Sequence, residues 1–330
     1  MRYVYLGKTG LKVSSLGFGT MSFGADADEE TSRALFHRCR EAGINLFDCA
    51  NVYAKGRSEE ILGELIGPCR DELVVTSKAY FPTSEDVNAR GSSRYHLTRA
   101  VEASLKRLKT DHIDIFFLHR FDDSTPLDET LRAVEDLVRS GKVLYPAVSN
   151  FAAWQTSKAL GIARQYGWSE IVCSQPMYNL VKRQAEVEIL PMAASEGLAV
   201  MPYSPLGGGL LSGRYGTKRR PDAGRLVDNP MYQVRYEDSE CYSVAERFTE
   251  FARVQGHTPV ALAIAWVASH PAVTAPLIGA RTLAQLEGAL AAAALNLDHD
   301  SRAAISALSR APAPATDRNE ETSTHNYGSR

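Results

Sequence analysis

Short apolar segments alternate with longer amphipathic segments along almost the whole chain, and this alternation is what most limits the possible folds. Stretches such as 93–108 and 126–142 repeat apolar residues every three or four positions, as amphipathic helices do. Strands that alternate with helices predict a parallel sheet covered on both faces. We expect strands at 14–20, 44–50, 73–79, 114–120, 143–150, 170–176, 198–205 and 273–280.

Two arrangements fit eight such units: an open doubly wound sheet, and a closed barrel. The number of units and the polar residues at nearly every strand end favour the (β/α)8 barrel. Residues 1–13 alternate around a turn and predict an N-terminal β-hairpin, while the Gly-rich stretch 207–234 predicts a long loop after strand 7. We expect one domain over residues 1–310, followed by a flexible Pro-rich and polar tail at 311–330.

The bulk composition excludes several classes of partner. With 37 Lys plus Arg against 39 Asp plus Glu, the net charge is -2, and no basic surface for nucleic acid is expected. No apolar run approaches the roughly 18 residues of a membrane span, so we expect no membrane insertion. Five cysteines without a CxxC pair do not predict a disulfide framework. A cytoplasmic protein that binds a small molecule is expected, as a monomer or an oligomer.

Two glycine-rich stretches resemble nucleotide motifs without matching them. The segment GFGTMSFG (17–24) has Ser22 where a dinucleotide fingerprint needs its third glycine. In PLGGGLLSGRY (205–215), Arg214 and Tyr215 replace the Lys and Ser/Thr of a P-loop. The backbone amides and the arginine of this second segment still suit an anion such as a pyrophosphate. A surface loop without a ligand is the alternative interpretation.

Metal and glycosidase chemistry have weaker support. The eight histidines form no HExxH motif and no Cys/His pair with ligand spacing, so no metal site is expected. Asp122 and Asp123 follow the fourth strand and suggest a glycosidase with paired carboxylates. A hydrated loop that caps the helix after Pro126 is the favoured interpretation of this pair.

Four polar residues at the ends of neighbouring strands predict a catalytic site. Asp48 ends the second strand and Tyr53 lies just beyond it, Lys78 ends the third strand, and His119 ends the fourth. In a parallel barrel they share the carboxyl face, where barrel enzymes carry their active sites. A Tyr has an ordinary pKa of about 10, and a neighbouring ammonium is expected to lower it. Tyr53 is then a candidate proton donor to a carbonyl oxygen, but hydride must come from a bound nicotinamide.

The sequence resembles the aldo-keto reductase family, in the branch that contains microbial aryl-alcohol and sugar-phosphate reductases and potassium-channel β-subunits. The resemblance runs from the hairpin to about residue 310. It is carried by blocks in the family's order at 17–24, 45–66, 74–79, 111–143, 147–151, 174–183, 201–215 and 275–290. It implies a (β/α)8 barrel that interconverts carbonyl and alcohol groups with NADP(H).

The resemblance also implies roles for individual residues. The family's catalytic tetrad corresponds to Asp48, Tyr53, Lys78 and His119, with Tyr53 as general acid in reduction and general base in oxidation. The cofactor set is Gly19, Thr20, Met21 and Asp48 near the nicotinamide; Ser149, Asn150 and Gln175 at its carboxamide, with Tyr203 on the ring; Ser204, Leu206, Gly209, Leu211 and Arg214 at the pyrophosphate; and Gly279, Arg281 and Gln285 at the 2′-phosphate.

Two questions stay open at this point. Ala289 stands where the family usually has an Asn, so NAD(H) is kept beside NADP(H) as a possible cofactor. The alternative function is that of an NADP(H)-binding sensor or partner protein with little turnover, as the channel β-subunits suggest. For the substrate, Phe23 and Tyr80 together with Tyr53 and His119 are expected to form an aromatic pocket, suited to aldehydes or ring-bearing ketones.

Overall fold

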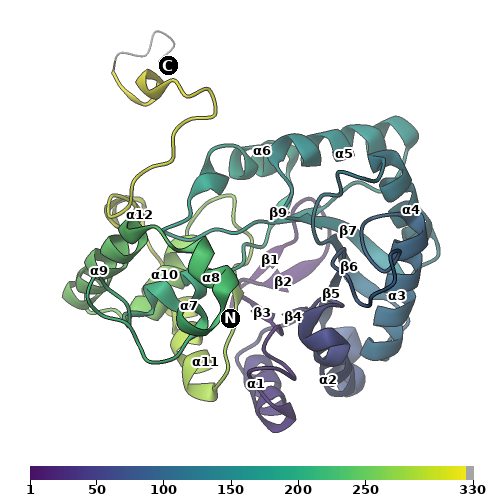
Figure 1. Cartoon of the computed structure of the whole chain (residues 1–330), viewed down its shortest axis with the longest axis horizontal. Coiled ribbons are helices and arrows are strands. Elements are labelled where there is room, and N and C mark those ends of the chain that lie inside the picture. Colours follow the sequence, from purple (N-terminus) through teal and green to yellow (C-terminus); the bar gives the residue numbers. More distant parts are fainter. Residues whose placement is uncertain (325–330) are drawn as a thin grey trace.

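The computed structural model describes residues 1–324 and contains a parallel eight-stranded sheet that curls into a barrel (Figure 1). The strand order is β10-β3-β4-β5-β6-β7-β8-β9. Backbone hydrogen bonds join the two end strands: the Thr274 amide donates to the Val200 carbonyl at 2.8 Å, and the Leu277 amide to the Pro202 carbonyl at 2.9 Å. The predicted barrel is therefore confirmed over the open doubly wound sheet. The strands are β3 (Gly17–Gly19), β4 (Leu46–Asp48), β5 (Val74–Ala79), β6 (Ile113–Leu118), β7 (Val143–Ser149), β8 (Cys173–Gln175), β9 (Ala199–Val200) and β10 (Leu277–Ile278).

Helices cover the outside of this sheet, because each amphipathic segment buries its apolar stripe against the strands. Seven of them are α1 (Glu29–Glu41), α2 (Arg57–Ile66), α3 (Arg94–Leu108), α4 (Leu127–Arg139), α5 (Ala153–Tyr166), α6 (Ile189–Glu196) and α10 (Pro259–Ala268). Two more, α9 (Ser239–Val254) and α11 (Leu283–Leu290), lie beside α10. Caps fix several of the starts; for example, the Asp28 carboxylate accepts from the Thr31 amide at 2.8 Å.

The inside of the barrel is packed with side chains, and the predicted N-terminal hairpin closes its lower end. Strands β1 (Tyr3–Tyr5) and β2 (Lys12–Ser14) pair antiparallel, and Leu6 and Val13 of this hairpin are fully buried. They belong to the same buried cluster as Phe117 and Met201, which point inward from the barrel. Such a filled interior leaves the carboxyl ends of the strands as the face on which a ligand can bind.

The long loop predicted at 207–234 contains helical structure. A 3-10 turn at Gly207–Ser212 is followed by two short helices, α7 (Arg225–Asp228) and α8 (Pro230–Arg235). The start of α8 has a recognisable sequence signal, since the Asn229 side chain accepts from the Met231 amide at 3.0 Å and Pro230 occupies the first helical position. Helices of four and six residues are too short to show an apolar period.

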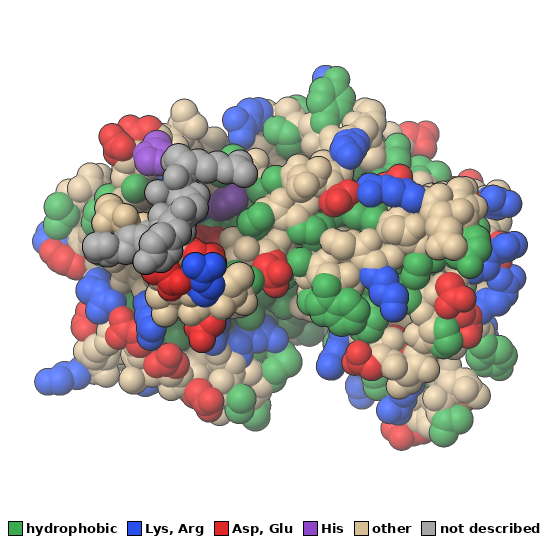
Figure 2. All heavy atoms as spheres, turned by 90° about the horizontal axis from the view of Figure 1, so that it is seen from above, with side chains coloured by type: hydrophobic (Ala, Val, Ile, Leu, Met, Phe, Trp, Pro, Cys, Tyr) green, Lys and Arg blue, Asp and Glu red, His purple; other side chains and the backbone are tan. Residues whose placement is uncertain are grey.

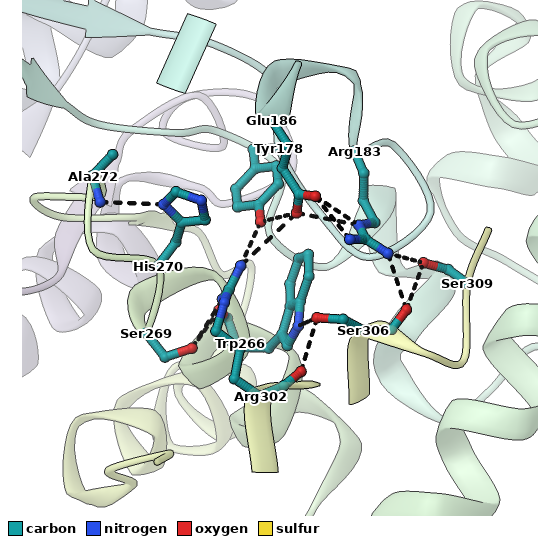
Figure 3. Close-up of polar contacts among 10 residues, drawn as sticks. All are labelled: Tyr178, Arg183, Glu186, Trp266, Ser269, His270, Ala272, Arg302, Ser306 and Ser309. Atoms are coloured by element: carbon teal, nitrogen blue, oxygen red, sulfur yellow. Dashed lines mark hydrogen bonds and ion pairs between the residues drawn. The ribbon is translucent and has the colours of Figure 1, made fainter. Parts of the chain in front are cut away.

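A polar network with little solvent exposure attaches the last helix, α12 (His299–Ser306), to the barrel (Figure 3). The Arg183 guanidinium lies 2.8 Å from the Glu186 carboxylate, which also accepts from the Tyr178 hydroxyl. Arg302 of α12 donates to the Tyr178 hydroxyl oxygen at 2.9 Å, and its guanidinium lies 4.8 Å from the ring of Trp266. The segment after β8, helix α10 and helix α12 are therefore held together by a few charged groups.

Residues 311–324 extend away from the barrel beyond α12, with one 3-10 turn at Asn319–Thr322 (Figure 1). Residues 325–330 of the predicted flexible tail lie outside the described residues, and the division of the chain at residue 310 stays a prediction. Acidic and basic side chains are interspersed over the face drawn in Figure 2. Within residues 1–324, none of the helices has the length and apolar character needed to cross a membrane.

Candidate active site

Four predicted catalytic residues meet at the carboxyl face of the barrel, around a buried ion pair. The Lys78 ammonium lies 2.6 Å from Asp48 Oδ2 and donates to the Cys49 carbonyl at 2.7 Å. The Lys78 side chain is fully buried, and that of Asp48 is 4% exposed. Neighbouring strands β4 and β5 supply the two residues, so the sheet register itself sets their separation.

The other carboxylate oxygen of Asp48 is held by two further side chains. The Thr76 hydroxyl donates to Asp48 Oδ1 at 2.7 Å, and the Gln175 amide donates to the same atom at 2.9 Å. Three donors fix the orientation of this buried carboxylate. Asp48 therefore positions the Lys78 ammonium and also connects it to Gln175 at the end of β8.

Tyr53 and His119 lie on the cavity side of this pair. The Lys78 ammonium is 5.3 Å from the centre of the Tyr53 ring, and the His119 ring is 6.1 Å from that ring at an interplanar angle of 79°. On its other side, His119 packs edge-on against Phe81 at 4.9 Å. Nδ1 of His119 is buried and has no hydrogen-bond partner among the described residues. Because this nitrogen is itself buried, a ligand in the cavity has no access to it, and the His119 ring lines the cavity with its other atoms.

The pKa of Tyr53 differs in direction from the sequence-based expectation. Burial raises it well above the ordinary value, and the Asp48 carboxylate adds to the increase. The expected lowering by Lys78 is therefore wrong for the protein without a ligand, because a buried phenolate is poorly solvated. A phenol that keeps its proton throughout the neutral range is suited to donating it.

His119 is neutral at any ordinary pH. Burial lowers the pKa of His119 to about 3, and the nearby Lys78 ammonium acts in the same direction. A neutral imidazole can donate or accept a hydrogen bond without adding a charge beside Tyr53.

A cavity of about 1200 Å³ opens directly next to Tyr53 and His119. It is lined by most of the residues predicted from the sequence, drawn from seven of the eight barrel units. These are Gly19, Met21, Asp48, Tyr53, His119, Ser149, Asn150, Gln175, Tyr203, Ser204, Leu206, Gly209, Arg214, Gly279, Arg281 and Gln285. The structure thus brings them to one site, while their individual roles stay predictions.

The structure corrects two residues of the predicted substrate pocket. Phe23 is fully buried in the core, where its ring lies 5.7 Å from that of Phe18, and it does not line the cavity. Tyr80 does not line the cavity either; it packs edge-on against Phe81 at 5.3 Å, and Phe81 is the residue that faces the cavity. Neighbouring residues of an extended segment point in opposite directions, so Phe81 faces the cavity and Tyr80, the predicted residue, does not.

Two of the predicted cofactor residues also do not line the cavity. Thr20 is fully buried and donates to the Asp48 backbone carbonyl at 3.0 Å, so it supports the end of β4. Leu211 is fully buried in the core beneath the 3-10 turn that contains it. Both lie behind the residues that line the cavity. At these positions the sequence does not indicate whether a side chain points into the cavity or into the core.

The lining also contains residues that the sequence analysis did not predict. Among them, Phe81 and Arg120 follow β5 and β6, and four belong to helices α7 and α8: Arg225, Met231, Tyr232 and Arg235. For α8, the Asn229–Pro230 start signal could have indicated a helix over the cavity, but nothing in the sequence indicated which way its side chains point.

The cavity wall is strongly basic although the whole chain is slightly acidic. Five of its lining residues are arginines, at positions 120, 214, 225, 235 and 281. The single acidic residue among them, Asp48, is paired with Lys78. Of these arginines only Arg281 has a carboxylate within 4.0 Å in the described chain, that of Asp26 at 4.0 Å. Such a wall suits an anionic ligand.

The backbone around the cavity has unusual conformations. Asn150 and Ser204 both line it with positive φ angles, of 56° and 57°, which non-glycine residues adopt only where the surroundings hold them. The Asn150 side chain donates to the His119 carbonyl at 2.9 Å and accepts from the Tyr203 hydroxyl at 2.7 Å. These contacts join the ends of β6, β7 and β9 into one rigid rim.

The two acidic residues that suggested a glycosidase are not part of the cavity. Asp122 accepts hydrogen bonds from the Ser92 and Ser124 amides and from the Thr125 hydroxyl, at 2.7, 2.9 and 2.7 Å. These bonds lower its pKa against the opposing effect of burial. Asp122 is therefore a loop residue, as the favoured interpretation predicted, but the helix after Pro126 has no side-chain cap. Within residues 1–324, no three His, Cys, Asp or Glu side chains are arranged to hold a metal ion.

The closed parallel barrel, with its polar cluster and basic cavity at the carboxyl face, has the architecture of a barrel enzyme. The sequence model of the aldo/keto reductase family matches residues 15–310, and the chain belongs to this family. It is an oxidoreductase of the aldo/keto reductase type, as the sequence resemblance predicted.

The alignments with individual relatives span most of this chain and most of each relative. An uncharacterized oxidoreductase, YrpG, from Bacillus subtilis (strain 168) is 39% identical over 91% of this chain and 93% of its own. A probable voltage-gated potassium channel subunit beta from Arabidopsis thaliana is 35% identical over 87% and 89%. The versiconal hemiacetal acetate reductase of Aspergillus parasiticus is 32% identical over 90% and 94%.

Proposed function

We propose that this protein reduces an aldehyde or ketone reversibly to an alcohol, with NADP(H) as hydride carrier and Tyr53 as general acid and base. One observation carries the proposal: a buried Lys78–Asp48 pair lies behind a protonated Tyr53 and a neutral His119, at the edge of a large basic cavity. This set can deliver and recover one proton at a carbonyl oxygen.

The residues present fit a nicotinamide dinucleotide. Its phosphates need cations, and the cavity has arginines 214, 225, 235 and 281 on the side built by β9, β10 and the segment between them. Gly209 lines the cavity with a φ of 103°, and a Cβ there would meet no atom within 4 Å, so its open side can admit a phosphate. When bound, the cofactor supplies the hydride.

The chain's own groups suggest how the dinucleotide is held. Ser149, Asn150 and Gln175 present hydroxyl and amide groups for the carboxamide, and Tyr203 offers its ring. Ser204, Leu206, Gly209 and Arg214 would surround the pyrophosphate. Arg281 and Gln285, at the start of α11, would surround the 2′-phosphate; their coupling is supported by the hydrogen bond from the Arg281 amide to Gln285 Oε1 at 3.0 Å.

The proton step follows from the charges around Tyr53. In reduction its hydroxyl donates a proton to the carbonyl oxygen as that oxygen becomes negative. His119, which lines the cavity beside Tyr53, orients the same oxygen. As Tyr53 loses its proton, the Lys78 ammonium stabilises the phenolate, and Asp48 holds Lys78 in place. In oxidation the phenolate takes the proton of the alcohol.

The test is a titration of the purified protein with NADPH and with NADH, followed by a panel of aldehydes and ketones. We expect tight binding of NADPH, measured by fluorescence, and oxidation of the bound NADPH when a suitable carbonyl compound is added. Failure to bind either nucleotide would contradict the whole proposal. Equal affinity for both would contradict the assignment of Arg281 to the 2′-phosphate.

The likeness to channel β-subunits favours a second candidate, a cofactor-binding partner protein with little turnover. The same titration separates the two functions. Tight binding of NADPH without oxidation by any carbonyl or alcohol of the panel would support the partner protein. We rank it second, because Tyr53, Lys78, His119 and Asp48 are all present in an arrangement able to transfer a proton.

A further inference from the structure

Arg120 is a cation of the cavity wall to which the proposed reaction assigns no task. It directly follows His119 at the end of β6 and lines the cavity. In the described part of the chain, its guanidinium has no hydrogen bond, ion pair or ring contact.

The simplest alternative is a surface arginine that pairs with an acidic neighbour. Asp122 is the obvious candidate two residues away, but its oxygens accept from the Ser92 and Ser124 amides and from Thr125. No ion pair joins Arg120 to Asp123 within the described residues. Arg120 is therefore left facing the cavity without a counter-ion.

The strand order separates Arg120 from the other four arginines. Around the closed barrel, β6 lies four strands from β10 in either direction, and so directly opposite. Arg281 follows β10, whereas arginines 214, 225 and 235 belong to the segment that leaves β9. A dinucleotide held by these four occupies the β9–β10 side. Arg120 remains on the far wall, beside the imidazole that would orient a substrate.

We propose that Arg120 binds an anionic group of the substrate, so that this protein acts on aldehydes or ketones that carry a carboxylate or a phosphate. The inference rests on the proposed carbonyl reduction and names its substrate class. The charged group lies against Arg120 while the carbonyl lies at Tyr53 and His119. Phe81 and Met21, which also line the cavity, provide an apolar wall for the carbon skeleton between them. A planar guanidinium binds either oxyanion with two parallel hydrogen bonds.

The test compares pairs of substrates that differ only in charge. For the carboxylate, 4-formylbenzoate is compared with its neutral analogue 4-formylbenzamide; for the phosphate, glyceraldehyde 3-phosphate is compared with glyceraldehyde. We expect kcat/KM with NADPH to be at least tenfold higher for one charged member than for its neutral partner. Arg120→Gln should reduce that ratio tenfold to a hundredfold, and Arg120→Lys should restore part of it.

Arg90→Gln is the matched control, because Arg90 is a loop arginine that does not line the cavity; it should leave the ratio unchanged. A binding measurement accompanies the kinetics: calorimetry should detect 4-(hydroxymethyl)benzoate binding to the wild-type protein with NADP⁺ and a tenfold or greater loss of affinity in Arg120→Gln. The preferred pair decides between carboxylate and phosphate.

Two results would overturn the inference while leaving the proposed function intact. One is reduction of the neutral aldehydes at rates equal to or above those of their charged partners. The other is a charge preference that Arg120→Gln does not reduce. If NADPH is oxidised with none of the four compounds while other carbonyls are reduced, the substrate class is also wrong. If no carbonyl of any kind is reduced, the proposed function itself fails.

Discussion

At the scale of single residues, the candidate site combines charged groups that are buried with neutral groups that face the ligand. Lys78 and Asp48 are held against each other by a short contact, whereas Tyr53 and His119 stay uncharged at the edge of the cavity. Each neutral group can therefore exchange a proton or a hydrogen bond with a substrate without first losing a stable ion pair.

Replacing Tyr53 tests the central role in the proposal. Tyr53→Phe should lower kcat/KM for carbonyl reduction by about 10² to 10⁴, since it removes the proton donor and little else. Steady-state kinetics gives this value, and a fluorescence titration should find the affinity for NADPH changed by less than about threefold. Tyr80→Phe is the matched control, because Tyr80 lies off the cavity. Retention of most activity in Tyr53→Phe would contradict the assignment.

The pKa values of the two neutral groups predict the pH dependence of reduction. Burial lowers the pKa of His119 to about 3, so His119 becomes charged only in strong acid. Burial raises the pKa of Tyr53 well above its usual value, so Tyr53 loses its proton only in strong alkali. Between pH 5 and pH 9 both stay neutral, and we expect a flat profile of kcat/KM for reduction. An inflection near the ordinary histidine pKa that disappears in His119→Asn would contradict this.

The sequence indicated which residues gather at the strand ends better than which residues line the pocket, for a geometric reason. Parallel strands bring their carboxyl ends to one face, so the positions of Asp48, Lys78 and His119 along the chain already implied their proximity. The direction of a single side chain beyond a strand end depends on local backbone angles. That is why Tyr80 was predicted in place of Phe81.

At the scale of elements, helix α12 depends on a few charged contacts with little apolar burial. Among its residues only Ile305 is fully buried, and Arg302 makes the polar contacts to Tyr178 and Trp266. Glu186 is central to this network because Arg183 and Tyr178 both bind it (Figure 3). The side chains of Arg183 and Glu186 are only 12% and 17% exposed.

Removing Glu186 should therefore destabilise the fold. Glu186→Ala leaves two arginines close together with little solvent, and we expect a loss of about 3 kcal/mol in the free energy of unfolding. Chemical denaturation measures the change. Glu250→Ala is the matched control: it breaks an exposed pair with Arg253, and its effect on the free energy of unfolding should be much smaller. Equal effects of the two substitutions would show that the network adds no more than a surface ion pair.

The elements themselves were predicted with uneven success. All eight barrel strands were found, because each is an apolar run with a turn signal on either side. The sequence does not predict that β9 and β10 have only two residues each. The length of a strand in a barrel depends on its pairing with neighbouring strands as well as on local sequence. The sequence predicts loop where helices α7 and α8 form part of the cavity wall.

At the scale of the whole molecule, the segment after α12 makes little contact with the barrel. Residues 311–324 extend away from it, whereas Ser309 still accepts a hydrogen bond from Arg183 at 3.2 Å (Figure 1). A chain that ends at Arg310 should therefore keep its melting temperature within about 2 °C and its affinity for NADPH unchanged. Differential scanning calorimetry provides the first value. A chain that ends at Asp298, which lacks α12, should melt clearly lower.

A large fall in melting temperature on removal of residues 311–330 alone would contradict the predicted domain limit at residue 310. The fold class was predictable at this scale, since eight alternating units have few closed solutions. The electrostatics of the site was not predictable from net charge. A chain with a slight acidic excess gathers five arginines around one cavity, and only the three-dimensional arrangement reveals it.

The hairpin that closes the lower end of the barrel has a consequence for access to the site. Because Leu6 and Val13 fill that end and side chains pack the interior, the cofactor and the substrate of the proposed reaction share the carboxyl face as their route in and out. The opposite end of the barrel is then free to serve stability alone.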